Sequence, residues 1–543
     1  MTTNRLSPTV ASNTVEETFD YVVVGGGSAG AAVAARLSED PNVTVALLEA
    51  GPTDVDKDVV LQLNRWMELL ESGYDWDYPI EPQKNGNSHM RHARAKVLGG
   101  CSSHNSCIAF WAPKEDMDEW EKLGAQGWNA ESTYPLFKRL ETNDQATGEP
   151  GDIHGDAGPV HLMQIPPKDP CGVALLEACQ QQGIPTVQFN TDETVVKGAN
   201  FFQVNRREDG TRASSSVSYI HPILDRENFT LLTDTWVKEI LFDDDGGVPR
   251  ATGVSVVNNA FGRASAIRAS KEVVISAGAI DSPKLLMLSG IGPAEHLQEH
   301  GIDVRVDSPG VGRHLQDHPE AVIAWEAKQP MVEDSTQWWE IGIFADTLEG
   351  SGASDRPGRP DLMMHYGSVP FDMHTLRQGY PTSDNTFCLT PNITHAKSRG
   401  TVRLRSRDYR DKPMVDPQYF TDPDGHDMRV AVAGIKLARE IVAQPAMAEW
   451  AGEELFPGKD VQTDEQIADY VQRTHNTVYH PAGTVRMGAA DDVMSPLTPD
   501  LRVKGVQGLR VADASVMPEL TTVNPNITTM MIGERCADLI KAG

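Results

Sequence analysis

Cysteine is scarce in this sequence, with 6 in 543 residues and no two of them arranged as a CxxC pair. Cysteines so few and so scattered suit neither a disulfide framework nor the paired thiolates of a zinc or iron–sulfur site, so we expect reduced thiols and no metal. The sequence has no run of about 20 apolar residues, the length that a transmembrane helix needs, and we expect no membrane partner. Residues 1–20 are polar and lack the features of a signal or transit peptide, which predicts a cytoplasmic protein.

Basic residues are also in the minority. The chain has 48 Lys and Arg against 77 Asp and Glu, and its formal net charge is −29 at pH 7. Charge of this sign repels phosphates, which argues against nucleic acid as a partner. It favours a small cationic substrate weakly and at long range, although solubility alone is a sufficient reason for it.

A glycine-rich turn near the start of the chain predicts a dinucleotide-binding site. Residues 19–24 (FDYVVV) have the apolar character of a buried strand, and Gly25-x-Gly27-x-x-Gly30 leads from it into a helix rich in small residues. Gly25 permits the tight turn, Gly27 lets the backbone approach a pyrophosphate, and Gly30 lets the helix pack closely on the strand. The free N–H groups and positive dipole at the start of the helix suit phosphate oxygens.

An acidic residue completes this strand–helix–strand unit. Residues 43–48 (VTVALL) predict a second strand, and Glu49 ends it, 19 residues after Gly30. A carboxylate at this point accepts hydrogen bonds from the adenosine ribose hydroxyls. The pattern alone does not separate FAD from NAD. Its place near the start of a long chain with no second complete fingerprint favours FAD.

Other elements are predicted from periodicity. Residues 426–444 predict an amphipathic helix, residues 282–288 a shorter one, and residues 526–540 a final helix. Short β-rich runs lie between residues 230 and 280, and residues 1–17 are expected to form a loosely tied arm.

Four further segments resemble the signature segments of the glucose–methanol–choline (GMC) oxidoreductases. They occur in that family's order over nearly the whole chain, as residues 95–105 (AKVLGGCSSHN), 278–292 (GAIDSPKLLMLSGIG), 480–484 (HPAGT) and 524–526 (NPN). The resemblance implies a mixed α/β fold, in which a Rossmann-like FAD-binding domain is interleaved with a substrate domain built on an antiparallel sheet. It also implies a homodimer. The expected domain segments are 1–165, 209–319 and 476–543 for FAD binding, and 166–208 and 320–475 for the substrate.

The first signature segment departs from the usual family pattern at two positions. Cys101 stands where Gly, Ser or Thr is expected, and we interpret it as a small buried filler. His104 stands where most members have an aliphatic residue. A histidine there matches the choline-oxidising members, in which this ring is bonded to the flavin 8α-methyl group. The resemblance therefore implies FAD held covalently through His104, and the alternative is a core histidine beside a non-covalent FAD.

The resemblance also implies which residues act on the substrate. Oxidising an alcohol removes the hydroxyl proton and passes a hydride to flavin N5, so an acceptor for that proton is needed. His480 is the candidate by family position, with Asn524 beside it to stabilise the alkoxide. His365 (in LMMHYG) is a second histidine expected near the same hydroxyl, and which of the two takes the proton stays open. Ser106 is expected to contact the flavin or the substrate hydroxyl.

A quaternary ammonium substrate needs aromatic faces and a carboxylate, because its nitrogen cannot donate a hydrogen bond. The family places Trp66, Trp339, Tyr479 and Phe371 at this pocket, with Glu320 as the carboxylate. For any single aromatic residue core packing is the simple alternative. A buried Glu320 without a partner would be costly in an apolar core, and a cationic guest accounts for it better.

Family position alone implies further cofactor contacts: Trp76 beside the cofactor, Val237 at the adenine ring, and Asp513 and Ala514 at the pyrophosphate and ribityl chain. The full set of expected cofactor-binding residues is Gly25, Gly27, Ser28, Ala29, Gly30, Glu49, Trp76, Leu98, Gly99, Gly100, His104, Asn105, Ser106, Val237, Asp513, Ala514, Asn524 and Pro525.

The resemblance thus implies a flavin-dependent oxidase acting on CH–OH groups. It would convert choline to betaine aldehyde and on to glycine betaine, with O₂ as acceptor and H₂O₂ as product. Three alternatives stay open: a choline dehydrogenase with a different electron acceptor, a redox-silent lyase on the same fold, and a flavin-binding protein without turnover.

Overall fold

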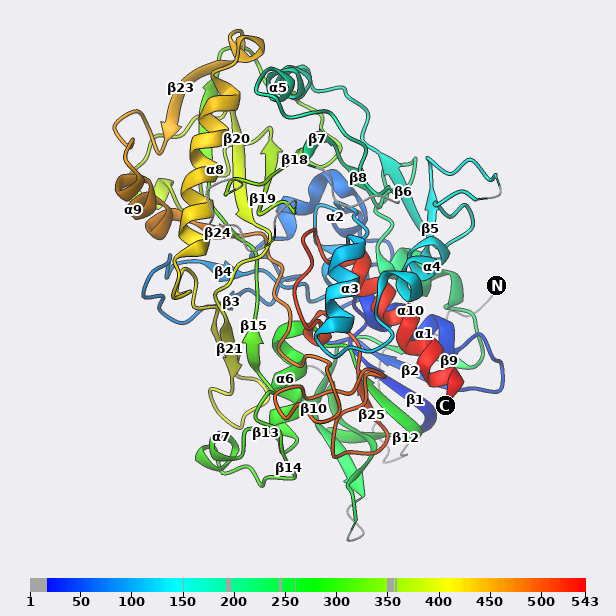
Figure 1. The fold of residues 1–543 in the computed structure, drawn as a ribbon. Coiled ribbons are helices and arrows are strands. Elements are labelled where there is room, and N and C mark those ends of the chain that lie inside the picture. Colours follow the sequence, from blue (N-terminus) through cyan, green and yellow to red (C-terminus); the bar gives the residue numbers. More distant parts are fainter. Residues whose placement is uncertain are drawn as a thin grey trace.

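Two large sheets organise the chain in the computed structural model (Figure 1). One lies in the lower part of that view and the other in the upper part. The structure describes residues 17–149, 151–191, 197–243, 247–258, 260–348, 356 and 359–543. Most of the arm expected over residues 1–17 lies outside this range, and Glu17 already belongs to the first strand.

The first sheet is mixed and has seven strands. Its order is β10 (Thr235–Asp243), β11 (Arg250–Asn258), β12 (Ala264–Ile275), β1 (Glu17–Val24), β2 (Val45–Leu48) and β9 (Phe229–Leu232), with β25 (Leu509–Val511) also on β12. β1 runs parallel to β12 and β2, and β25 runs parallel to β12, whereas β10, β11 and β12 are antiparallel. Val22 and Val23 are fully buried, as the continuous apolar run predicts for a parallel strand covered on both faces.

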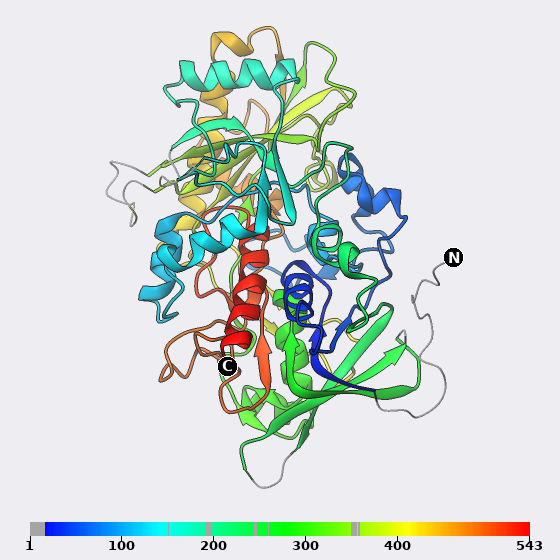
Figure 2. The same cartoon turned by 90° about the vertical axis from the view of Figure 1, so that its right-hand side faces the viewer.

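Two helices from opposite ends of the chain cover this sheet side by side: α1 (Ser28–Leu37) and α10 (Asn526–Ala542) (Figure 2). Gly533 makes their close approach possible, since a Cβ there would lie 2.4 Å from the Ala29 carbonyl oxygen. Glu534, fully buried on α10, accepts hydrogen bonds from Arg36 of α1. The last helix is therefore part of the nucleotide-binding layer.

The second sheet has eight strands, and all of its pairings are antiparallel. Its order is β23 (Ala451–Phe456), β17 (Ile323–Ala327), β20 (Thr386–Ile393), β19 (Leu362–Gly367), β18 (Trp339–Ala345) and β7 (Gly198–Phe201), with β16 (Pro319–Glu320) and β24 (Asn476–Thr477) at one end. The fold is thus the expected α/β combination of a doubly wound sheet and an antiparallel sheet. β24 belongs to the second sheet, although it lies just after residue 475, where the sequence predicts the substrate domain to end.

The remaining elements are shorter or flank the sheets. The helices are α2 (Asp58–Leu61), α3 (Lys114–Lys122), α4 (Ala130–Leu140), α5 (Pro170–Gln181), α6 (Gly278–Leu288), α7 (Ala294–Glu299), α8 (His426–Val442) and α9 (Asp464–Thr474). The small strands are β3 (Tyr78–Pro79), β4 (Arg91–His92), β5 (Glu141–Asn143), β6 (Val160–Gln164), β8 (Gln203–Val204), β13 (Ile291–Gly292), β14 (Val306–Asp307), β15 (Arg313–Leu315), β21 (Gly400–Arg403) and β22 (Met414–Asp416).

Helix α6 begins earlier than the sequence predicts, at Gly278 instead of Ser282. Asp513 stabilises its first turn, because one carboxylate oxygen accepts from the Gly278 N–H (2.9 Å) and the Ser282 hydroxyl (2.6 Å). Pro283 has no N–H for the Ala279 carbonyl, and the Thr484 hydroxyl donates to that carbonyl instead (2.6 Å). Side chains from two segments that are distant in sequence, at Thr484 and Asp513, therefore stabilise the added first turn of α6.

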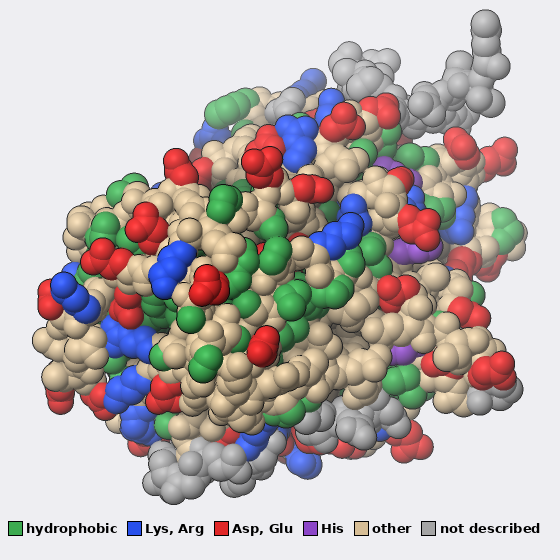
Figure 3. All heavy atoms as spheres, turned by 90° about the horizontal axis from the view of Figure 1, so that it is seen from above, with side chains coloured by type: hydrophobic (Ala, Val, Ile, Leu, Met, Phe, Trp, Pro, Cys, Tyr) green, Lys and Arg blue, Asp and Glu red, His purple; other side chains and the backbone are tan. Residues whose placement is uncertain are grey.

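The molecular surface carries charges of both signs. On the face seen from above, acidic side chains are dispersed among basic and apolar ones, without a continuous basic patch (Figure 3). Within the described residues, no helix is long and apolar enough to cross a bilayer.

Candidate active site

A cavity of about 320 Å³ extends from the carboxyl ends of the parallel strands to the second sheet. Residues within two positions of the ends of β1, β2, β12 and β25 line it: Gly25, Glu49, Ser276 and Asp513. Ligands of open α/β sheets bind at this edge, where successive strands leave a crevice between their connections.

The glycine turn has the geometry that a dinucleotide needs. Gly25 has φ +102°, and a Cβ there would lie 2.4 Å from the Ser276 carbonyl oxygen. A Cβ on Gly30 would lie 2.0 Å from the Gly25 carbonyl oxygen, so only glycine lets the helix approach the strand. A Cβ on Gly27 would meet no atom closer than 3.9 Å, and this space faces the cavity. The turn therefore leaves room for a phosphate.

Glu49 lies beside this turn and is almost completely buried. Its two carboxylate oxygens accept from the backbone N–H groups of Gly26 (3.0 Å) and Gly51 (2.8 Å). Burial raises the pKa of the Glu49 carboxyl to about 7. Each oxygen keeps further acceptor capacity, so the geometry fits the expected contact with ribose hydroxyls.

The first signature segment packs directly on the glycine turn. The Gly99 N–H donates to the Gly26 carbonyl (2.7 Å), and a Cβ on Gly100 would lie 2.7 Å from the Gly27 Cα atom. Gly99 and Leu98 support the turn from behind and do not line the cavity. The chain then brings residues 104–106 to the cavity wall.

His104 is buried at this wall. One ring nitrogen, Nε2, lies 3.2 Å from the Leu69 carbonyl oxygen and 4.0 Å from a carboxylate oxygen of Asp75. Burial lowers the pKa of His104 to about 4, although Asp75 opposes the shift. A neutral ring that donates from Nε2 to the carbonyl keeps a lone pair on its other nitrogen.

The start of α10 closes the cavity beside the glycine turn. Ala514, Asn524 and Pro525 line the wall, and the Ser28 hydroxyl donates to the side-chain oxygen of Asn526 (2.8 Å). The N-termini of α1 and α10 therefore converge on the cavity, which suits an anionic pyrophosphate. The Asp513 carboxylate also lines the cavity, but its hydrogen bonds anchor α6.

The far end of the nucleotide region is aromatic. Trp76 packs edge-on against Trp236 with ring centroids 4.9 Å apart, and both line the cavity next to Val237. The Lys96 ammonium lies 4.9 Å from each of the two tryptophan ring centroids. Val237, expected at the adenine ring, and Trp76, expected beside the cofactor, thus both line the cavity.

His480 is held by a hydrogen-bond chain that defines its protonation. The Thr394 carbonyl can only accept, so Nε2 of His318, 3.0 Å away, donates to it. Nδ1 of a neutral His318 is then an acceptor, and Nδ1 of His480, 2.9 Å away, donates to it. Nε2 of His480 is left with its lone pair on the cavity side, 3.5 Å from the Asn524 amide nitrogen.

Burial keeps these rings neutral. It lowers the pKa of His318 to about 4 and that of His365 to about 3, and it lowers the pKa of His480 well below its usual value. Neighbouring histidines and Arg94 add to the shift of His480. A neutral His480 with an unprotonated Nε2 is the form that accepts a proton.

Four buried polar atoms of residues that line the cavity have no protein partner among the described residues. Oγ of Ser276 and the side-chain nitrogen of Asn526 belong to the nucleotide region, whereas Nε2 of His365 and the side-chain oxygen of Asn524 belong to the region of His480. Buried polar atoms in native proteins are nearly always hydrogen-bonded, so an unpaired atom at a cavity wall marks a ligand contact. His365 and Asn524 line the cavity together with His480. The structure therefore brings the three expected catalytic side chains to one place, with Ser106 on the same wall.

Beyond these histidines, the cavity ends against the second sheet in an aromatic pocket. Trp66, Trp339, Tyr479 and Phe371 all line it. The Trp339 and Phe371 rings meet edge-on with centroids 4.9 Å apart, and the Trp66 indole N–H donates to the Gln337 carbonyl (2.8 Å). These contacts fix aromatic surface toward the cavity.

Glu320 is the carboxylate of this pocket and only 4% of its surface is exposed. The Asn476 amide donates to one of its oxygens (3.2 Å), and Thr390 gives a second hydrogen bond. No ion pair to Glu320 is found within the described ranges. Burial raises the pKa of the Glu320 carboxyl to about 8, and Asp317 adds to the effect. The pocket thus has a carboxylate that lacks a positive partner.

Three residues at this site were not anticipated from the sequence. His318 orients His480, Asn476 donates to Glu320, and Arg94 lines the cavity and donates to the Tyr479 carbonyl. His318 and Asn476 lie in the segments LQDHPE and HNTVYHP beside predicted site residues, and this proximity was the available signal. No comparable signal marks Arg94.

A strand-end cavity with a glycine turn and a buried histidine–asparagine pair defines a dinucleotide-dependent oxidoreductase site. Two family models, both described as "GMC oxidoreductase", match this chain, one over residues 19–320 and the other over residues 396–533. The chain belongs to the GMC oxidoreductase family. Its fold is that of the family's flavoproteins, with an FAD-binding domain and a substrate domain.

Similar proteins include several that are named for choline. Choline oxidase of Arthrobacter globiformis is 72% identical over 98% of this chain and 95% of its own length. Oxygen-dependent choline dehydrogenase of Sinorhizobium fredii is 36% identical over 96% of this chain and 95% of its own. Among solved structures, pyridoxine 4-oxidase from Mesorbium loti superposes with TM-score 0.86 at 29% identity, over 97% of this chain and 99% of the other.

Proposed function

We propose that this chain is an FAD-dependent choline oxidase that converts choline to betaine aldehyde and then, as the hydrate that the aldehyde forms with water, to glycine betaine. The observation that carries the proposal is Glu320, a buried carboxylate that no cation among the described residues pairs with, facing the same cavity as His480. A trimethylammonium group would supply the missing charge, and the aromatic faces of Trp66, Trp339 and Tyr479 would contact its methyl groups. The 72% identity to a protein named choline oxidase supports this substrate.

The cofactor is FAD, which supplies the hydride acceptor when bound. The turn at Gly25 and Gly27 and the start of α1 would hold its pyrophosphate, and Glu49 its adenosine ribose. Trp76 and Val237 would contact the adenine region. These assignments rest on the lining of the cavity.

The residues at the other end of the cavity would act on the hydroxyl group. His480 accepts the hydroxyl proton at Nε2, because His318 keeps its Nδ1 protonated. The Asn524 amide and Nε2 of His365 lie at the same wall and would hold the oxygen in place, with Ser106 nearby. Positioning and proton transfer together contribute about 10²-fold or more to such reactions.

We also propose that His104 holds the FAD covalently. Its pKa of about 4 keeps the ring neutral, and the Leu69 carbonyl leaves one ring nitrogen with a free lone pair for a bond to the flavin methyl carbon. That bond would replace a C–H bond of the methyl group, which would lose a proton, and the two electrons left on the flavin would pass to O₂. After precipitation with acid, the protein pellet should stay yellow, and the pellet of His104→Asn should be colourless. A colourless parent pellet would refute the covalent bond while leaving the oxidase function open.

O₂ is the proposed acceptor, with H₂O₂ as product. The 72% identical relative is named an oxidase and the 36% identical one an oxygen-dependent dehydrogenase, and both names favour O₂ over another acceptor. Purified protein should consume O₂ with choline and no added dye. A dehydrogenase would need the dye, and a lyase would leave its flavin oxidised under anaerobic choline. The homodimer and the cytoplasmic location remain predictions, and light scattering after gel filtration tests the first.

A further inference from the structure

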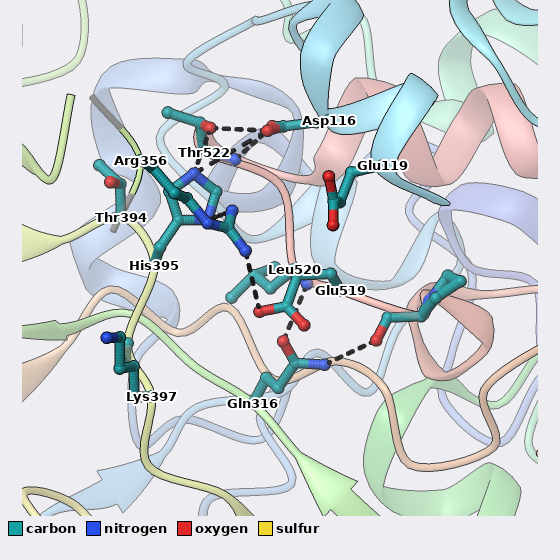
Figure 4. A network of polar contacts seen from close by, with 12 residues as sticks. Asp116, Glu119, Gln316, Arg356, Thr394, His395, Lys397, Glu519, Leu520 and Thr522 are labelled. Carbon is teal, nitrogen blue, oxygen red and sulfur yellow. Dashed lines mark hydrogen bonds and ion pairs between the residues drawn. The ribbon is translucent and has the colours of Figure 1, made fainter. Parts of the chain in front are cut away.

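The loop that carries Asn524 is tied to the protein by a polar network outside the cavity (Figure 4). This loop, residues 518–524, lies between a short 3₁₀ helix at Ala514–Val516 and α10. The Leu520 N–H donates to the Gln316 side chain (3.0 Å), and the Trp120 indole N–H donates to the Glu519 carbonyl (2.8 Å). Arg399 donates to the Glu519 carboxylate (2.6 Å). The strongest cluster of contacts lies further along, at Thr522.

Thr522 lies two residues before Asn524 and is bonded to a buried carboxylate. Its backbone N–H donates to one oxygen of Asp116 (2.6 Å), and its hydroxyl donates to the other (2.9 Å). Asp116 is 3% exposed in the first turn of α3, and Arg359 pairs with it. Charge-assisted hydrogen bonds of this kind are about twice as strong as neutral ones.

His395 completes the network. A donor-only group at one end of the network and an acceptor-only group at the other define the direction of every hydrogen bond between them. Arg356 has only donors, so Nδ1 of His395, 2.8 Å from the guanidinium, accepts. Nε2 then carries the proton and donates to the Thr522 hydroxyl (2.7 Å), which donates onward to the acceptor-only Asp116. Burial, reinforced by Arg356 and Arg359, lowers the pKa of His395 well below its usual value and keeps it neutral. The chain runs Arg356, His395, Thr522, Asp116.

His395 is bonded in sequence to Thr394, whose carbonyl begins the other hydrogen-bond chain. That carbonyl accepts from His318, which in turn orients His480. The Thr394 hydroxyl and N–H are fixed by the Pro360 and Asp361 carbonyls (2.7 Å and 3.0 Å). One dipeptide therefore holds both partners of the candidate catalytic pair, His480 through His318 and Asn524 through Thr522.

We propose that Thr394–His395, with Thr522 and Asp116, sets the distance between His480 and Asn524. These are positioning residues, since none of them lines the cavity. The observed separation of 3.5 Å between His480 Nε2 and the Asn524 amide nitrogen is at the limit of a hydrogen bond, so small shifts of the 518–524 loop change it. The inference rests on the proposed oxidase function but concerns a different part of the molecule.

A matched pair of variants tests the proposal on the full-length, flavin-loaded protein. Thr522→Val keeps the shape of the side chain and removes its hydroxyl, whereas Thr522→Ser keeps the hydroxyl. Thr133→Val is the control, because Thr133 is fully buried in α4 and its hydroxyl bonds only a helix carbonyl (2.9 Å). Steady-state kinetics with choline and O₂ give kcat and KM for each protein well below its unfolding temperature.

The kcat of Thr522→Val should fall by roughly 10- to 100-fold, the size of effect that a displacement of about 1 Å has at a reacting centre. Its KM for choline should change little, because Glu320 and the aromatic pocket are untouched. Thr522→Ser should keep most of kcat, and Thr133→Val all of it. Equal kcat for the Val and Ser variants would overturn the proposal, and so would a loss confined to thermal stability.

Crystal structures of the two Thr522 variants give a reading that needs no substrate. The Asn524 amide should move out of reach of His480 Nε2 in Thr522→Val and remain in place in Thr522→Ser. An unchanged separation in the Val variant would refute the positioning role. A parent protein that is inactive with choline would instead refute the proposed function, and the distance between His480 and Asn524 would still decide the inference.

Discussion

Binding of a permanently charged ligand should depend on pH through Glu320. Burial raises the pKa of this carboxyl to about 8 in the free protein, and a quaternary ammonium ion would bind only the ionised form well. The ionised fraction of Glu320 is about one half at pH 8 and about 1% at pH 6. The apparent Kd should therefore rise roughly 50-fold as the pH falls from 8 to 6, and the rise should be close to tenfold per pH unit near pH 6.

Tetramethylammonium is the suitable ligand, because it carries the charge but has no hydroxyl to react. Isothermal titration calorimetry at pH 6 in two buffers of different ionisation enthalpy should show the release of about one proton on binding. The same ligand should bind Glu320→Gln weakly and with no dependence on pH between 6 and 8. The neutral isostere 3,3-dimethylbutan-1-ol should show no such dependence with the parent protein. A Kd for tetramethylammonium that is constant from pH 6 to 8 would refute the role given to Glu320.

Three further results should follow. Glu320→Gln should raise the unfolding midpoint of the ligand-free protein at pH 9 more than at pH 5. The pKa of Glu320 is higher in the folded protein, so its ionisation lowers the free energy of unfolding by an amount on the order of a few kcal/mol as pH rises from about 4.5 to 8. An equal effect of the substitution at both pH values would contradict this. Gly30→Ala should abolish FAD binding or folding, since its Cβ would meet the Gly25 carbonyl oxygen at 2.0 Å; full flavin content would refute the packing argument. His318→Ala should lower kcat by roughly 10- to 100-fold with little change in KM, because nothing then keeps the proton of His480 on Nδ1 and Nε2 free to accept the substrate proton. An unchanged kcat would show that His480 needs no such partner.

Local features of this chain were predictable because short-range physics determines them. The glycine turn, the strand before it and Glu49 after the next strand follow from sterics and strand periodicity, and the structure has them at those positions. Helix α8 ends at Val442, close to the predicted residue 444, because its apolar stripe is continuous. Family segments then placed the candidate site residues, nearly all of which line one cavity.

Long-range contacts were not predictable in the same way. The start of α6 depends on Asp513, which lies 231 residues from Ser282 in sequence. The bond between His318 and His480 joins residues 162 apart, and the bond between Asp116 and Thr522 joins residues 406 apart. No local pattern encodes such pairs, because each partner is compatible with many other environments until the sheets are assembled.

Oxygen uptake by the purified protein is the most direct test of the central claim, that Glu320 and the aromatic pocket select a cationic alcohol for oxidation at His480. The account predicts rapid O₂ consumption with choline, H₂O₂ as product, and a much lower kcat/KM for 3,3-dimethylbutan-1-ol, with this preference lost in Glu320→Gln. Equal kcat/KM for the charged and the neutral alcohol in the parent protein would contradict it.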